Sequence, residues 1–251
     1  PSGVSGDTGQ IMGTAVKAEV TVTVGVNKPG LILYPGRSYA GEVKLVDIGY
    51  PSALVDKVKP FAYYYEKEDI RKKLPPRPAY SNKGTFGKVL VAAGSETMCG
   101  ACLMVAAAAY KMGAGLVRVC TVKENREVIF GRLPEAVFTT REELEEGLAW
   151  ADAVVAGPGL GRSDEALSFM NRLLEQNKKP LVIDGDGIYL ARQCKRKLPS
   201  GTIITPHLKE LEGFAEVSVI GHPEKLPQIV SGLAADQGII VVGKDAKTVV
   251  S

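Results

Sequence analysis

The chain has 251 residues, of which 45% are hydrophobic, so it is long enough to bury a substantial core in one large domain or two smaller ones. Its formal net charge is only +3, and its basic residues are spread out apart from a cluster between residues 57 and 77, which argues against nucleic-acid binding. No run of about 20 uncharged apolar residues occurs, so we expect no membrane span.

The four cysteines are too few for a disulfide scaffold in a chain of this length. Reduced thiols in a cytoplasmic protein are therefore the simpler interpretation.

The first part of the chain predicts a β segment rich in loops. Residues 18–26 alternate with β-branched side chains at almost every position and predict a strand, and residues 42–48 predict a second strand. Pro-Gly turns at residues 29–30 and 35–36 separate the two. We interpret residues 1–56 as the tail of a domain.

A stretch rich in Lys, Tyr, Pro and Arg follows and ends as Leu-Pro-Pro-Arg-Pro at residues 74–78. Such a sequence cannot continue a helix or a central strand, because proline lacks the backbone donor that both require. Residues 57–81 are therefore predicted to form a linker.

From residue 82 onward, predicted strands alternate with predicted helices. The strands cover residues 88–93, 116–122, 136–139, 153–156, 181–184, 202–205 and 238–242, and the helices cover residues 100–112, 142–150, 164–176, 187–195, 208–217 and 224–237. This alternation predicts an α/β domain over residues 82–251, with a mainly parallel sheet and helices on both faces.

Glycines and acids follow two of these strands, at the sheet edge where α/β proteins bind ligands. Residues 157–161 read Gly-Pro-Gly-Leu-Gly, and three glycines exceed what a turn needs, which favours close backbone approach to a nucleotide or phosphate ligand. The spacing is not that of the dinucleotide fingerprint. Asp184 and Asp186 could hold a metal-bound phosphate or a hydroxyl, although an Asx turn would use the same residues.

Further candidates lie at other strand ends. Ser95 could face a phosphate or a sugar, or could belong to a plain strand-to-helix turn. His207 follows the strand at residues 202–205; a lone histidine is often a core or cap residue, but this position at the sheet edge is better placed for substrate contact. Residues 244–248 turn between two β-rich runs and could offer amides and lysines to a nucleotide phosphate, but a solvated hairpin would look the same.

Taken in order, the motifs after residue 82 resemble the ADP/ATP-dependent NAD(P)H-hydrate dehydratases, which have the ribokinase-like fold. They are Asn-Lys-Gly-Thr-Phe-Gly at 82–87, Gly-Ser at 94–95, Gly-Ala-Gly-Leu at 113–116, the glycines of 157–161, Asp-Gly-Asp at 184–186 and Thr-Pro-His at 205–207.

The first segment resembles the C-terminal remnant of the α/β NAD(P)HX epimerase domain that many bacteria fuse ahead of the dehydratase. The matching residues are 1–4, 7–9, 21–24, 28–30 and 47–49.

The resemblance implies repair of damaged nicotinamide cofactors. Hydrated NADH or NADPH (NADHX or NADPHX) would be phosphorylated on the ring hydroxyl by ADP or ATP with Mg²⁺, and elimination of phosphate would restore the double bond. The full-length protein would also be an epimerase that uses K⁺. We expect a homo-oligomer.

Residue roles carried over from the family are the following. The substrate would contact Ala101, Gly159, Gly161, Asp184 and His207; the nucleotide site would include Lys244, Asp245, Ala246, Lys247 and Thr248; and Ser2 matches a potassium ligand of the epimerase.

The chain departs from the family pattern in three respects. Asp245 stands where the family usually has glycine, so its carboxylate should weaken nucleotide binding. Family members also carry a later Gly-Ser-Gly-Asp loop whose Asp is the catalytic base, and this chain stops at Ser251 before such a loop. The epimerase segment equally lacks its upstream loop and the Asp that normally precedes Pro1. We therefore expect a fragment of a bifunctional enzyme that turns over little or nothing when isolated.

Two other functions remain open. A ribokinase-like kinase acting on a vitamin precursor would share the fold and the phosphate-binding logic, although the motif at 82–87 and the epimerase-like segment argue against it. A non-catalytic nucleotide-binding module is the second alternative. The sequence does not separate ADP from ATP dependence, although epimerase fusions are common in bacteria, where the family more often uses ADP.

Overall fold

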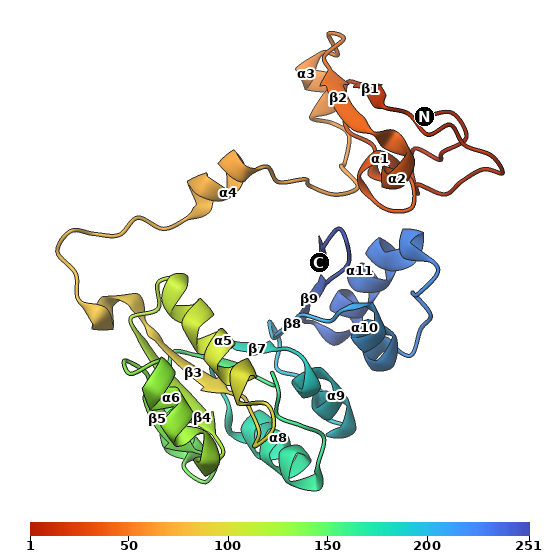
Figure 1. Cartoon of the computed structure of the whole chain (residues 1–251). Coiled ribbons are helices and arrows are strands. Elements are labelled where there is room, and N and C mark those ends of the chain that lie inside the picture. Colours follow the sequence, from red (N-terminus) through yellow and green to blue (C-terminus); the bar gives the residue numbers. More distant parts are fainter. The chain divides into compact units, whose positions relative to one another are not determined.

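The computed structural model describes residues 1–251 and divides the chain into two compact units, Pro1–Ser81 and Asn82–Ser251 (Figure 1). The first unit contains a two-stranded sheet and the second an eight-stranded sheet. None of the helices combines the length and the apolar composition that crossing a bilayer requires.

The sheet of the first unit is parallel. Strands β1 (Val20–Val24) and β2 (Glu42–Val46) pair in register, and helices α1 (Pro29–Ile32) and α2 (Arg37–Ala40) lie between them in the chain. Both predicted strands are confirmed, each shorter than expected. The helices were not predicted because each has only four residues, too few to show a helical period.

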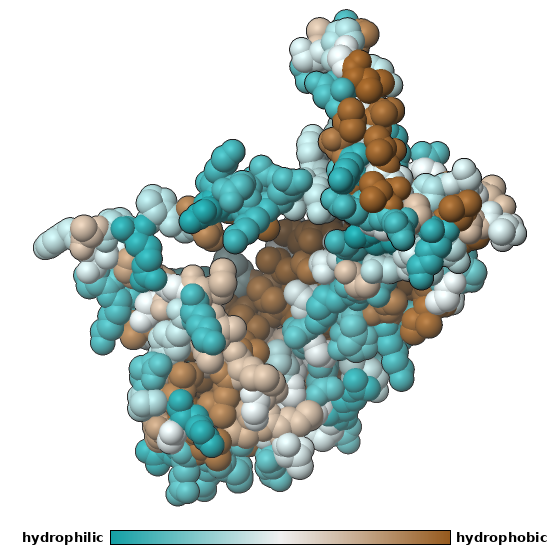
Figure 2. All heavy atoms as spheres, turned by 45° about the horizontal axis from the view of Figure 1, so that its top comes forward, coloured by the Kyte–Doolittle hydropathy of each residue, from teal (hydrophilic) through white to brown (hydrophobic).

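Much of the apolar surface of this unit is exposed, as the brown band in Figure 2 shows. Val22 on β1 is 62% exposed and Leu45 on β2 is 51% exposed. A two-stranded sheet has little of its own to cover such side chains.

The segment that follows β2 carries two short helices, α3 (Ser52–Val55) and α4 (Lys67–Lys73). Helix α4 begins with a capping box between Glu66 and Asp69 and ends at Leu74, where the predicted proline-rich stop begins. The predicted linker, residues 57–81, therefore contains one helix that the sequence interpretation did not include.

The sheet of the second unit has the strand order β10-β9-β8-β7-β6-β3-β4-β5. All neighbouring strands are parallel except β9 and β10, so the predicted mainly parallel sheet is confirmed. The strands are β3 (Lys88–Ala92), β4 (Leu116–Thr121), β5 (Val137–Thr140), β6 (Ala153–Ala156), β7 (Leu181–Ile183), β8 (Ile203–Ile204), β9 (Ile240–Gly243) and β10 (Val249–Val250).

Every helix predicted for this unit is present. They are α5 (Cys99–Lys111), α7 (Leu144–Trp150), α8 (Asp164–Gln176), α9 (Asp186–Gln193), α10 (Leu208–Ala215) and α11 (Leu226–Gln237). Helix α6 (Arg126–Arg132) was missed, because its apolar residues Val128, Ile129 and Phe130 are consecutive and show no period of 3.6.

The helices form separate cores on the two faces of this sheet. On one face, α5 and α6 bury Cys102, Ala106 and Ile129 against the β3 and β4 side chains Val91 and Val119. On the other face, α7 to α11 bury the opposite row of the sheet, including Val154, Leu181, Ile183, Ile204 and Val241. Alternate residues of each strand therefore enter different cores.

Coverage of the sheet is uneven. Strand register places Val155, Val182, Ile203 and Ile240 in one row on the face that carries α5. None of these residues belongs to either core, and Ile240 is 39% exposed. In this chain, helices cover both faces of the β3–β4 part but only one face of β6 to β9.

Adjacent isoleucines on β8 test this difference. Ile204→Ala removes a fully buried side chain and should cost about 3 kcal/mol of unfolding free energy, whereas Ile203→Ala should cost roughly 1 kcal/mol because its row is partly exposed. Urea unfolding of both variants measures the two losses. Equal losses would mean that the row containing Ile203 is covered as well as the helical face.

Candidate functional site

The direction in which successive strands are added to the sheet changes between β3 and β6. From β3 the chain adds β4 and β5 on one side, and from β6 it adds β7, β8 and β9 on the other. Doubly wound sheets bind ligands outside the carboxyl ends of the strands at such a switch point. The loops that leave β3 and β6 there, residues 94–98 and 157–161, are called the switch-point loops below, and both were singled out from the sequence.

Backbone hydrogen bonds tie these two loops together. The Gly157 amide donates to the Ala92 carbonyl at 3.0 Å, and the Gly94 amide donates to the Pro158 carbonyl at 2.8 Å. Main-chain hydrogen bonds therefore join the two switch-point loops directly.

Two of the glycines in 157–161 are required by contacts within the protein. Gly157 has φ +120°, and a Cβ there would lie 2.1 Å from the Asp184 carbonyl oxygen. A Cβ on Gly159 would lie 2.7 Å from the Cβ of Ala101, at the start of α5. At these two positions the close approach is made to other parts of the protein, and the predicted approach to a ligand stays a prediction. Gly161 is different, since a Cβ added there would have no atom within 4 Å.

Asp184 links the β7 end to its neighbours. Its Oδ1 accepts hydrogen bonds from Thr205 Oγ1 at 2.7 Å and from Lys244 Nζ at 2.8 Å. Burial raises the pKa of this carboxyl, but the hydrogen bonds from Lys244 and Thr205 outweigh it and leave the pKa below its ordinary value. Asp184 is therefore ionised and already paired at neutral pH.

His207 caps helix α10. Its Nδ1 accepts a hydrogen bond from the Glu210 amide at 3.1 Å, and its own amide donates to Glu210 Oε2 at 2.9 Å. The cap that was one interpretation of this histidine is thus present. Its side chain is also 54% exposed, so the ring is accessible to a ligand.

Lys244 lies beside His207, because the two residues form a parallel β-bridge and the Lys244 amide donates to the Pro206 carbonyl at 2.8 Å. The turn 244–248 joins β9 to β10 as a hairpin, which was the alternative to a nucleotide loop. Its residues Asp245, Ala246 and Thr248 are exposed and Lys247 is partly exposed, so the two interpretations are compatible.

Most of the candidates from the second unit thus form one chain of contacts. Ala101 lies against Gly159, the same loop contacts Asp184 through Gly157, Asp184 binds Lys244, and Lys244 pairs with His207. Gly161 belongs to the same loop as Gly157 and Gly159, and its amide donates to Asp186 Oδ2 at 3.1 Å.

Ser2, the predicted potassium ligand, lies in the first unit and is exposed, and its carbonyl accepts the Val16 amide at 3.0 Å. Its role as a potassium ligand stays a prediction. No group of three or more His, Cys, Asp or Glu side chains is arranged to hold a metal ion, so Mg²⁺ would have to be held largely by phosphates and water.

Sequence reasoning missed the residues that fasten the β3 loop. Asn125 is 2% exposed and donates through Nδ2 to the Ser95 carbonyl at 3.2 Å, and Arg141 donates to the Gly94 carbonyl at 2.7 Å. Arg141 stands among charged residues that predict a solvated surface, so no pattern marked it.

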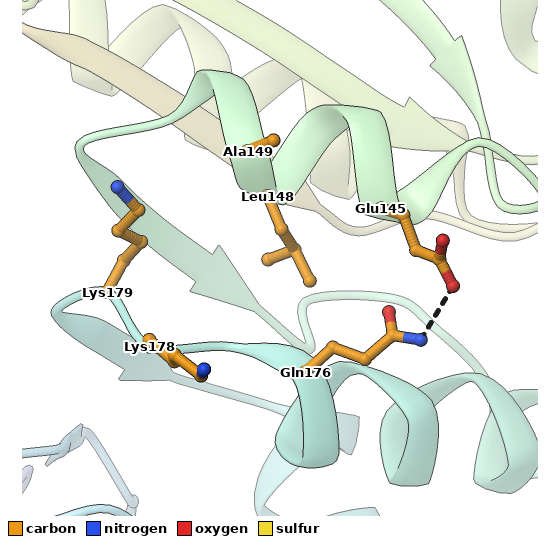
Figure 3. Close-up of a pocket in the computed structure, with 6 residues that line it drawn as sticks. All are labelled: Glu145, Leu148, Ala149, Gln176, Lys178 and Lys179. Carbon is orange, nitrogen blue, oxygen red and sulfur yellow. Dashed lines mark hydrogen bonds between the residues drawn. The ribbon is translucent and has the colours of Figure 1, made fainter.

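A surface hollow is also present, away from the switch-point loops. It has a volume of about 400 Å³ and lies between α7 and the C-terminal end of α8, where Gln176 Nε2 donates to Glu145 Oε1 at 2.8 Å (Figure 3). Lys178 and Lys179, between α8 and β7, complete its lining. None of the predicted site residues lines this hollow, and we assign it no role.

The fold and the switch point together define a ribokinase-like α/β protein. The family model for NAD(P)H-hydrate dehydratase matches residues 89–251, which is more than half of the chain. The chain belongs to the NAD(P)H-hydrate dehydratase family.

Known relatives agree with this membership. The bifunctional NAD(P)H-hydrate repair enzyme Nnr of Thermofilum pendens is 35% identical over 100% of this chain, which corresponds to 50% of that protein. The ADP-dependent (S)-NAD(P)H-hydrate dehydratase of Lactococcus lactis is 38% identical over 72% of this chain and 66% of its own length. The chain thus spans about half the length of the bifunctional relatives that it matches.

Solved structures give the same fold. The ADP/ATP-dependent NAD(P)H-hydrate dehydratase of Bacillus subtilis, co-crystallised with ATP and Mg²⁺, superposes with a TM-score of 0.66 at 27% identity, over 75% of this chain and 68% of that one. A ribokinase-like superfamily protein of Enterococcus faecalis gives a TM-score of 0.68 at 27% identity, over 76% of this chain and 71% of that one.

The glycine contacts give a paired test. Gly157→Ala should destabilise the protein by about 3 kcal/mol or more, because the new Cβ meets the Asp184 carbonyl and the positive φ is also strained. Gly161→Ala should cost only about 1 kcal/mol, because it adds strain at φ +78° without a clash. Urea unfolding compares them, and similar losses would show that the loop relaxes around position 157.

The Asp184 pair predicts a pH-dependent contribution to stability. Because the folded pKa is depressed, the stabilisation is present above the unfolded value of about 4 and is lost as the pH falls through the folded value. Asp184→Asn should therefore cost about 0.5–1 kcal/mol at pH 7, a small figure because both side chains are partly exposed, and less at pH 3.

Urea unfolding at the two pH values measures this difference. Glu175→Gln, an exposed change on α8, is the control and should have little effect at either pH. A cost for Asp184→Asn that is undiminished at pH 3 would contradict the assigned pairing.

Proposed function

We propose that this chain carries the dehydratase part of a nicotinamide-cofactor repair enzyme, which uses ADP or ATP to convert hydrated NADH or NADPH back to NADH or NADPH. The observation that carries the proposal is the chain of contacts from Ala101 through Asp184 to His207. It brings segments that are far apart in sequence to one edge of the sheet, in a protein of the dehydratase family.

The hydrated cofactor would bind over the switch-point loops. Ala101 and Gly159 are small and in contact, so a ligand could come close to the backbone at these positions. Gly161 has open space at its α-carbon. His207 would reach the cofactor through the exposed part of its ring. Because Nδ1 accepts the Glu210 amide, the proton of the neutral ring is on Nε2, which lies 3.3 Å from Glu210 Oε1.

The nucleotide would bind at the turn 244–248. Lys247 supplies a positive charge that is not committed to an ion pair, while Lys244 is already paired with Asp184. Asp245 is exposed on the same turn and would reduce affinity for phosphates by repulsion. When bound, the nucleotide with Mg²⁺ supplies the phosphoryl group that turns the ring hydroxyl into a leaving group.

The first unit is proposed to be the end of an epimerase domain, with Ser2 as one potassium ligand, residues 57–81 as the linker, and the dehydratase domain from residue 82. The relatives that are bifunctional repair enzymes support this assignment. A cytoplasmic location and a homo-oligomer stay predictions.

The activity test supplies hydrated NADPH with ADP or ATP to the full-length protein that contains these residues. We expect restored NADPH, measured by its absorbance, and one inorganic phosphate released for each NADPH formed. A phosphorylated product that accumulates without NADPH would favour the vitamin-precursor kinase. Nucleotide binding with no product of either kind would favour the non-catalytic module.

A matched variant ties the activity to the switch point. Gly159→Ala should lower kcat/KM for hydrated NADPH by about tenfold or more, because the added methyl group displaces Ala101. Gly232→Ala, on α11 with open space around its α-carbon, is the control and should leave kcat/KM nearly unchanged.

A further inference from the structure

Arg141 contacts both switch-point loops at once. It follows β5, and its Nη2 donates to the Gly94 carbonyl at 2.7 Å and to the Leu160 carbonyl at 3.3 Å. Gly94 belongs to the loop after β3 and Leu160 to the loop after β6. A single guanidinium nitrogen thus donates hydrogen bonds to both loops at the switch point.

The guanidinium is itself held in place. It lies 5.3 Å from the centroid of the Phe169 ring on α8, in a cation–π contact, and Arg172 of the same helix donates to the Arg141 carbonyl. The Arg141 Nε is buried and has no hydrogen-bond partner in the structure. The two loop carbonyls therefore provide the polar contacts of this partly buried cation.

Charged donors form stronger hydrogen bonds than neutral ones, and a buried cation without acceptors would be costly. Burial lowers the pKa of Arg141, yet a guanidinium stays protonated at any physiological pH. The cation consequently favours any arrangement of the loops that keeps both carbonyls turned toward it.

The β3 loop has a second fastening that does not reach the β6 loop. Asn125 donates to the Ser95 carbonyl and also to Thr121 Oγ1 at 2.9 Å. Among the side chains described, Arg141 is the one that joins the two loops through side-chain hydrogen bonds.

We propose that Arg141 is a positioning residue that sets the spacing of the switch-point loops, and through it the fit of the dinucleotide substrate. This inference rests on the proposed function for the identity of the substrate but not for the spacing itself. Because the nucleotide turn 244–248 has no contact with Arg141, nucleotide binding should not depend on it.

The test compares Arg141→Met, which keeps a stem over Phe169 but removes the donors, with Arg141→Lys, which keeps the charge. Arg118→Met is the matched control, since Arg118 stacks on Trp150 at 4.7 Å and has no contact with either loop. Amide hydrogen exchange of residues 94–98 and 157–161 is measured without ligand in the full-length protein, followed by KM values for hydrated NADPH and for ADP.

Arg141→Met should speed exchange in both loops by about tenfold and raise KM for hydrated NADPH by about tenfold, the loss expected for charged hydrogen bonds. KM for ADP should stay within about twofold, and Arg141→Lys should be intermediate. Arg118→Met should leave both loops unchanged even if it lowers the melting temperature. If Arg141→Met fails to fold, Arg141→Lys carries the comparison.

Unchanged exchange in the loops would overturn the inference, as would equal increases in both KM values or the same loop exchange in Arg118→Met. If the unmodified protein does not consume hydrated NADPH, the proposed function fails and the link to that substrate fails with it. The exchange data would still decide whether Arg141 fixes the loops.

Discussion

Main-chain contact between the ends of β3 and β6 is the constraint on which the site depends. Ala92, Gly94, Gly157 and Pro158 exchange backbone hydrogen bonds, and Gly157 passes so close to the Asp184 carbonyl that no side chain fits. Sheet order alone would leave the two loops diverging from a common edge. These contacts instead hold them side by side, so the strand ends can present a shared surface to a ligand.

Charged side chains also hold the strand ends at this edge of the sheet in place. Asp184 is held ionised by Lys244 and Thr205, and Arg141 places a partly buried positive charge against the carbonyls of both switch-point loops. A partly buried charge is stable only with partners, so each of these groups also fixes the segment that supplies its partner. The same pairs therefore serve both the stability of the fold and the shape of the site.

Sequence reasoning found the sheet, the helices and the loops at the strand ends because long apolar runs and glycine clusters report directly on backbone geometry. It missed α6, whose apolar residues are adjacent rather than periodic, and the helices of four residues in the first unit. It could not find Arg141 or Asn125 as fastenings, since their partners are backbone carbonyls that leave no mark in the sequence. Nor could it tell that Gly157 and Gly159 approach protein atoms, because that depends on how distant segments pack.

The reliance on glycine has a consequence for reading variation in this protein. Functional sites are usually sought as groups of reactive side chains, yet Gly157 and Gly159 contribute by having none, and every larger residue would intrude on Asp184 or Ala101. In a saturation-mutagenesis profile, the largest losses on substitution should therefore fall at these glycines, which have no reactive side chain. Such positions would be dismissed by methods that score charge or reactivity, although they fix the shape of the surface on which any ligand must rest.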